Sequence, residues 1–530
     1  MVYLLLTLFM LIIVIKYNML AKLSLSLNKY ISWESTNLDS TKVKISNSLT
    51  HNDLIRLMER FDYKPGGGIC FGFTLTWAQD VVAVREAVFY ERLNLVRNEK
   101  AHFASKLGVI TRKIRSHQLI NQQENQLLEV KSFIEAVCIA QSPNNYEELY
   151  NKRLTQTNVD NIINIAQQGL ICGDLAIKRV FTKTVAFSTS SEVIQYFKYL
   201  AFLIQKFDNL AIVISNERHS IGLKKDVRGW LLLDINYLYR QSPDYPYLIL
   251  NDEQLSYQLN TSFNEQAQFI INFDFIALDN LTLRKQLAAL NDMFPVTHKH
   301  FLFKNSREVS FIAICAQSGD EQSIAELVKL HNSRRYLLTP EEIRTALEFA
   351  IDGNQMRILT LLMYLHGFDI NMACLSDGTT ALGLACEFGN LSLVKLLLTH
   401  TCINVDATNC NGDTPLMLAC KKSKKSMELI TVLLEAGASV IKENDRHQNA
   451  LAIAKVNDNY VAISAIRIYE RSKCLTDIVT NRRDLSLLEG QYPPLSTLAT
   501  YGYTFFTSQS PAAPIEKAIK PESLGKCSLN

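Results

Sequence analysis

The sequence predicts an α+β domain over residues 45–300 and an all-α repeat solenoid over residues 307–475. Three observations support this fold class. A glycine-rich segment leads through Cys70 into a helical pattern, apolar strand-like segments surround His219 and Asp234, and similar segments recur every 34 or 35 residues after position 310. Recurrence at that period is typical of stacked helical repeats. A chain of 530 residues has room for two or three such domains.

The first element is an apolar run over residues 2–15, closed by Lys16. A membrane-spanning helix needs about 20 residues. A secretory signal peptide begins with a basic segment and ends in a small-residue cleavage site, and this run has neither. Three interpretations stay open for residues 1–20: a membrane anchor, a helix that docks on the protein, or an artefact of a chain that truly starts at Met19. We favour the last.

Cys70 begins a predicted amphipathic helix, preceded by three glycines. Apolar residues recur on one face of this helix at Phe71, Leu75, Ala78 and Val82. The unpaired N–H groups and positive dipole end of a helix N-terminus stabilise a thiolate, which is the nucleophilic form of cysteine. Cys70 is therefore a candidate nucleophile, and the alternative is a small buried apolar residue.

A nucleophilic cysteine needs a base and a group that orients the base. His219 follows a predicted strand over 210–214, and Asp234 is the one acid in the apolar run over 229–237. Antiparallel pairing of the two segments would bring this carboxylate beside the imidazole, and a carboxylate in an apolar run is costly unless it is paired. The order of Cys70, His219 and Asp234 predicts a catalytic triad. Residues 80–205 are mostly helical by period.

These segments resemble the papain-fold cysteine proteases, in particular the YopT-like group of bacterial effectors. The resemblance lies in the Gly-x-Cys spacing with a tryptophan seven residues on, a histidine opening a strand and an aspartate ending the next. It covers roughly residues 45–300. It implies that Cys70 is the nucleophile, His219 the general base and acid, and Asp234 the group that orients the imidazole. Trp77 would pack at the nucleophile helix.

The segment before Cys70 departs from that family. Papain-like enzymes usually carry Gln or Asn there to bind the oxyanion, whereas Lys64 stands at the position six residues before Cys70. The backbone N–H of Cys70 remains a donor, and Asn52 is the candidate side-chain donor. Cys172, also flanked by glycines, is the alternative nucleophile, and Cys138 is predicted to be a core residue of a helix.

The second half of the chain repeats itself. Thr414–Cys420 follows Thr380–Cys386 by 34 residues, and weaker copies begin at Phe311, Thr345 and Asn449. The pattern is similar to the ankyrin repeat, whose first helix reads Thr-Pro-Leu-His-x-Ala, although Met417 replaces the histidine. We expect about five repeats over 307–475, which bury their apolar faces against one another and present a concave protein-binding surface.

Composition limits the function classes. A net charge of +3 is nearly balanced, so DNA binding is not expected. An RNA or ribonucleoprotein partner would have to use the basic loop over 421–425. The odd number of cysteines, 11, indicates reduced thiols rather than a disulfide framework. No spacing indicates a zinc site, and no motif calls for a cofactor or a metal.

The tail over 476–530 is rich in proline and serine and packs poorly. The joint architecture resembles the AnkH-type ankyrin-repeat effectors of Legionella, which implies a type IV secretion signal in this tail. It also implies delivery into the cytoplasm or nucleus of a host cell, with membrane association through residues 2–15 as an alternative. Two functions follow. The first is an effector that binds a host protein through its repeats and acts on it by cysteine-dependent amide acyl transfer, as a protease, deamidase or transglutaminase. The alternative is a non-enzymatic adaptor with an inactive papain-like scaffold.

Overall fold

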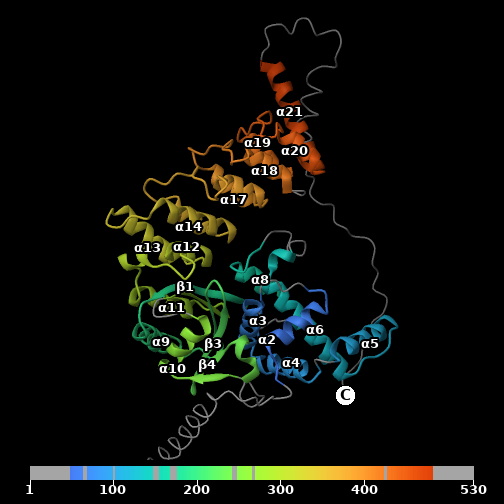
Figure 1. The fold of residues 1–530 in the computed structure, drawn as a ribbon, viewed down its shortest axis with the longest axis vertical. Helices are drawn as coiled ribbons and strands as arrows, with labels where there is room; N and C mark the ends of the chain where they lie inside the picture. The colour runs from blue at the N-terminus through green and yellow to red at the C-terminus, as the bar shows by residue number, and fades with distance from the viewer. Residues whose placement is uncertain are drawn as a thin grey trace, which may run out of the picture.

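The computed structural model describes residues 48–63, 68–99, 102–146, 154–166, 176–240, 247–264, 269–422 and 427–480 (Figure 1). The interpretations of residues 1–20, Lys64, Cys172 and the tail after 480 lie outside these ranges, as does most of the basic loop over 421–425. Within the described ranges no helix is long and apolar enough to cross a membrane.

A six-stranded sheet, antiparallel throughout, forms the centre of the upstream domain, in the order β1-β6-β2-β3-β4-β5. The strands are β1 (Ile177–Phe187), β2 (Ala211–Ser215), β3 (Ser220–Asp226), β4 (Gly229–Leu233), β5 (Leu248–Leu250) and β6 (Phe269–Leu278). The α+β class with an antiparallel sheet is therefore confirmed. Among the described residues of 80–205 most are helical, as expected, and the 11-residue strand β1 is the exception.

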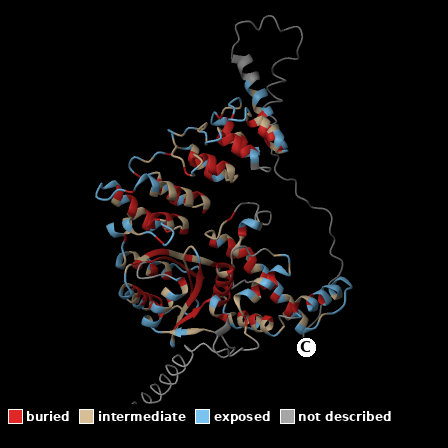
Figure 2. Cartoon of the chain, viewed as in Figure 1, coloured by how far each residue is buried: buried red, intermediate tan, exposed pale blue. Residues whose placement is uncertain are grey.

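Helices cover both faces of the sheet, and the apolar side chains form a separate core on each face (Figure 2). One layer contains α2 (His51–Glu59), α3 (Cys70–Val82), α4 (Glu86–Glu99), α5 (Phe103–Arg115), α6 (Gln122–Gln141), η1 (Pro143–Tyr146), α8 (Val159–Ala166) and η2 (Ile235–Arg240). The other contains α9 (Ser190–Ile204), α10 (Asp252–Phe263) and α11 (Leu281–Met293). Helix α3 is buried on all sides from Phe71 to Val82, so its first residue is held rigidly.

Close approach of α3 to β3 depends on Gly222. A Cβ at this position would lie 2.4 Å from Cζ3 of Trp77, whose ring is fully buried and cannot move aside. We expect Gly222→Ala to lower the free energy of unfolding by about 1–3 kcal/mol, the usual cost of overpacking. Urea denaturation followed by tryptophan fluorescence measures this. Gly108→Ala in α5 is the control, because its Cβ meets nothing within 4 Å; equal stability of the two variants would contradict the prediction.

Ten helices follow in five antiparallel pairs within the described residues, after a short η3 (His298–Leu302). They are α12 (Phe311–Ser318) with α13 (Glu321–Asn332), α14 (Pro340–Asp352) with α15 (Met356–Leu362), α16 (Ala381–Glu387) with α17 (Leu391–Leu398), α18 (Pro415–Lys422) with α19 (Met427–Glu435), and α20 (Ala450–Val456) with α21 (Tyr460–Thr480). Their inner faces share one continuous apolar core. Small residues such as Ala385 and Ala419 are fully buried there, so neighbouring helices can approach closely.

The first helix pair docks on the free edge of β1. Asp320, which is 1% exposed, caps α13 through the backbone N–H of Ser323, and its Oδ2 also accepts a bond from the N–H of Thr184 at 2.8 Å. Beside it, Lys183 is 2% exposed and donates to the Ser323 hydroxyl at 3.2 Å. The repeats thus satisfy an edge N–H that would otherwise be unpaired, and the stack and the sheet form one continuous body.

Candidate active site

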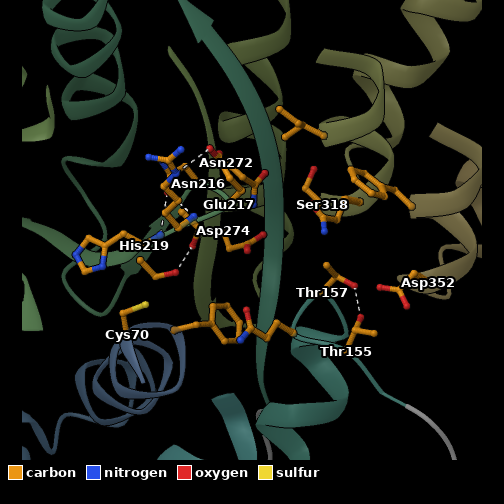
Figure 3. A pocket seen from close by; sticks show the side chains of 18 of the residues that line it. Cys70, Thr155, Thr157, Asn216, Glu217, His219, Asn272, Asp274, Ser318 and Asp352 are labelled. Atoms are coloured by element: carbon orange, nitrogen blue, oxygen red, sulfur yellow. Dashed lines mark hydrogen bonds and ion pairs between the residues drawn. The ribbon is translucent and has the colours of Figure 1, made fainter. Parts of the chain in front are cut away.

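Cys70, His219 and Asp234 occupy the ends of three elements that meet at one point. Cys70 is the first residue of α3, His219 immediately precedes β3, and Asp234 immediately follows β4. Strands β3 and β4 pair with Gly222 opposite Leu233, so the two adjoining strand ends lie together. Figure 3 shows Cys70 and His219 near one another on one side of the cavity.

His219 is held by contacts to its ring and to its backbone. Its Nε2 lies 2.9 Å from Oδ1 of Asp234, and both side chains are buried. The Asp234 Oδ1 also accepts a bond from the backbone N–H of Asn236 at 2.9 Å. Asn216 Oδ1 accepts a bond from the backbone N–H of His219 at 2.9 Å and so fixes the turn that carries the ring. Because Asp234 engages Nε2, Nδ1 is left to serve the thiol.

The charges of Cys70 and His219 stabilise each other. Burial raises the pKa of the Cys70 thiol, but a hydrogen bond with His219, the charge of that ring and two backbone N–H groups outweigh burial and lower the pKa below its ordinary value. Burial lowers the pKa of His219, yet hydrogen bonds with Asp234 and Cys70 raise it to about 9. These directions favour a thiolate–imidazolium pair at neutral pH.

The pair opens into a cavity of about 680 Å³. One wall comes from the end of α6 and from residues 142–144 and 155–157, the floor from β6 and the β2–β3 turn, and the opposite wall from the first two repeats. In Figure 3, Ser318 and Asp352 of the repeats lie across this cavity from Cys70 and His219. Groups of histidine, cysteine or carboxylate side chains suited to a metal ion do not occur among the described residues.

Trp77, predicted to pack at the nucleophile helix, lies in the core, whereas Asn52, the predicted oxyanion donor, lies away from the cavity. Trp77 is fully buried on α3 itself, packs on Gly222 and donates its indole N–H to Glu86 at 3.2 Å. Asn52 is exposed on α2 and is not among the described residues that line the cavity. Gln141 lines the cavity instead, and its Oε1 accepts a bond from the backbone N–H of Gly72 at 3.0 Å.

One further histidine, His51, and one further cysteine, Cys138, are not members of the triad. Burial lowers the pKa of His51, and the charge of His219 lowers it further, so His51 is a neutral neighbour that the sequence reasoning missed. The sequence around His51 shows only a capping box of Thr50 and Asp53, which indicates the start of α2 and does not indicate contact with the site. Cys138 is a buried residue of α6, and burial raises its pKa to about 12, so this thiol is protonated at neutral pH.

Comparison with known proteins shows ankyrin repeats in this chain. A family model for ankyrin repeats (3 copies) matches residues 347–445. The nuclear factor NF-kappa-B p105 subunit of Mus musculus is 32% identical over 136 residues, which are 26% of this chain and 14% of that protein. YahD, a protein of Escherichia coli (strain K12) named for ankyrin repeats, is 42% identical over 85 residues, 15% of this chain and 42% of its own length. The matches confirm ankyrin repeats within the predicted range of 307–475 and span less than half of either relative.

Proposed function

We propose that this protein binds another protein through its ankyrin repeats and transfers an acyl group from an amide of that protein to Cys70. Cys70 belongs to the papain-like domain that precedes the repeats. The observation that carries the proposal is the buried His219–Asp234 hydrogen bond of 2.9 Å beside a thiol of lowered pKa at a helix start. Ankyrin repeats are protein-binding surfaces in general. Delivery into a host cell is an expectation from the resemblance to effectors.

The chemistry follows from the proton positions. The Cys70 thiolate attacks the amide carbonyl carbon and forms a C–S bond, and the carbonyl oxygen becomes an oxyanion. The His219 imidazolium then gives its Nδ1 proton to the amide nitrogen as the C–N bond breaks, which releases an amine and leaves a thioester. In the second half, neutral His219 takes a proton from water or from an acceptor amine as it attacks the thioester, and the C–S bond breaks.

Gln141 is the side chain that we assign to the oxyanion. Its Oε1 is fixed by the Gly72 N–H, so its Nε2 is the amide group left to donate into the cavity. The backbone N–H of Cys70, at the first position of α3, is the second donor. Each preorganised donor of this kind typically raises the rate by about 10²–10³-fold.

The pH dependence of Cys70 alkylation tests the proposal. Because its pKa is lowered, we expect the rate with iodoacetamide to reach half its maximum below the ordinary value of 9.0. Acyl transfer should fall as the pH rises through about 9, where His219 loses the proton that it gives to the leaving group. Mass spectrometry of labelled peptides measures the alkylation rate, with Cys138 as an unreactive internal control.

A midpoint of alkylation at or above 9.0 would show that Cys70 is not activated, and the papain-like domain would then be the scaffold of an adaptor. Full-chain protein is used, because the cavity includes the first two repeats.

A further inference from the structure

The cavity beside Cys70 does not belong to the sheet domain alone. Residues from two repeats line it: Asn305, Arg307, Val309, Ile314, Gln317, Ser318, Phe349 and Asp352. The repeats are fixed in this position by buried contacts, among them the bond between Thr184 and Asp320 and a second between the Thr184 and Ser318 hydroxyls at 2.8 Å. A ligand that reaches Cys70 through this cavity therefore passes along the repeats.

The first repeat also touches the turn that carries the imidazole. Its hairpin is closed by pairing of Lys304 with Ser310, and Oδ1 of the buried Asn305 accepts bonds from two backbone N–H groups across the tip. The Ser306 hydroxyl at this tip donates to Oε1 of Glu217 at 3.1 Å. Glu217 is two residues before His219, and the next residue of the hairpin, Arg307, lines the same cavity as Cys70 and His219.

Among the described residues, four of the six Arg, Asp and Glu side chains that line the cavity form ion pairs with one another, and Arg307 and Asp352 are the other two. Arg179 forms an ion pair with Asp274 at 3.3 Å and donates to the carbonyl of Ser318. Glu217 accepts the Ser306 bond and faces Arg218 at 3.8 Å. Arg307 is exposed, and its guanidinium has no ion pair within the part of the chain that the structure describes.

The uncharged part of the lining suits a polypeptide backbone. Its polar members are amides and hydroxyls, including Gln141, Thr157, Asn216, Asn272 and Gln317. Such side chains both donate and accept hydrogen bonds, as the two ends of a peptide group require. Apolar atoms contribute as much of the lining as polar atoms do, from side chains such as Phe71, Ile270 and Phe349, so the cavity can hold both the backbone and the apolar side chains of a peptide.

We propose that the substrate is an extended polypeptide segment that lies between the sheet domain and the first two repeats, with an acidic side chain beside Arg307. The guanidinium would bind this carboxylate within a few residues of the amide that meets Cys70, because Arg307 adjoins the His219 turn. The inference rests on the proposed function for the chemistry at Cys70. The first two repeats then determine specificity at the reacting site, whereas the later repeats bind the protein elsewhere.

The chain contains a matched control for Arg307. In the last repeat, Asn444 Oδ1 accepts bonds from the backbone N–H groups of Arg446 and Gln448, the same arrangement that Asn305 makes with Arg307 and Val309. Arg446 therefore has the same place on the same kind of hairpin, and it does not line the cavity. Replacing either arginine removes an exposed cation from a hairpin tip whose backbone is held by an asparagine side chain.

The test is peptide binding to full-length Cys70→Ala protein, which needs no reactive thiol. Fluorescein-labelled decapeptides of alanine and serine carry one central Glu, Gln or Lys, and fluorescence anisotropy gives their Kd. We expect the Glu peptide to bind about fivefold more tightly than the Gln peptide, the factor for one partly exposed ion pair. Arg307→Gln should abolish this ratio, and Arg446→Gln should keep it.

A Glu-to-Gln ratio near one in the Cys70→Ala protein, or a ratio that survives Arg307→Gln, overturns the inference. Failure of the proposed function has a different signature, which is slow alkylation of Cys70 in the otherwise unaltered chain. An active thiol without Glu preference rejects the acidic substrate alone, and an inert thiol with Glu preference rejects the chemistry alone.

Discussion

Replacing His219 with alanine is expected to slow alkylation of Cys70 at pH 7 by about 100-fold. Without the imidazolium, burial is the largest remaining influence on the Cys70 thiol, and it raises the pKa to at least the ordinary 9.0. A thiol of that pKa is only about 1% thiolate at pH 7, whereas pairing with His219 lowers the pKa of Cys70 and so raises its thiolate fraction. Iodoacetamide labelling followed by mass spectrometry measures the rate constant directly.

His447→Ala is the control for loss of a histidine, because His447 is an exposed residue of the last repeat. Gln141→Ala separates activation of the thiol from binding of the oxyanion. It should leave alkylation unchanged, since that reaction forms no oxyanion, and should slow acylation by p-nitrophenyl acetate by about 10²-fold. Alkylation in His219→Ala within a factor of three of the unaltered protein would rule out a Cys70–His219 pair.

Asp320→Ala is expected to have the largest effect on stability, a loss of about 3–5 kcal/mol. The substitution leaves the Thr184 and Ser323 N–H groups without their acceptor and removes the acceptor of the Ser323 hydroxyl, to which the buried Lys183 donates. Buried polar groups deprived of a charged partner carry costs of this size. Urea denaturation followed by circular dichroism measures the change.

Asn390 provides the comparison, because it caps α17 in the third pair as Asp320 caps α13 in the first, through a bond to the N–H of Leu393. Asn390→Ala should cost only about 1 kcal/mol, the usual value for loss of an N-cap. If the two alanine variants lose equal stability, the contact of Asp320 with β1 contributes nothing beyond capping.

The sequence reveals residues that stand at the ends of regular elements. Cys70 follows glycines at the start of a helical period, and His219 and Asp234 flank apolar strands, so local pattern and chain order were enough to place them together. The repeats were visible because the same apolar spacing returns every 34 or 35 residues. The papain-like fold itself stays a prediction from the resemblance.

Contacts between segments that are far apart in the sequence could not be predicted from local sequence patterns. Strand β1 has a register irregularity between Arg179 and Phe181, and one edge is covered by the repeats, so its burial does not alternate as in a half-exposed strand. Gln141 reaches Gly72 across 69 positions of sequence. Asp320 could be read from its neighbours only as a helix cap, and its bond to Thr184 depends on how the two parts dock.

The shared cavity wall constrains how this protein can change over evolution or in the laboratory. Repeat arrays are ordinarily lengthened, shortened or exchanged as units, because each repeat contacts only its neighbours. On the proposed function, such an exchange would leave the Cys70 site unchanged only from the third repeat onward. The first two repeats would be inherited together with Cys70, and a graft that carries the sheet domain alone would transfer Cys70 without the cavity wall that these repeats form.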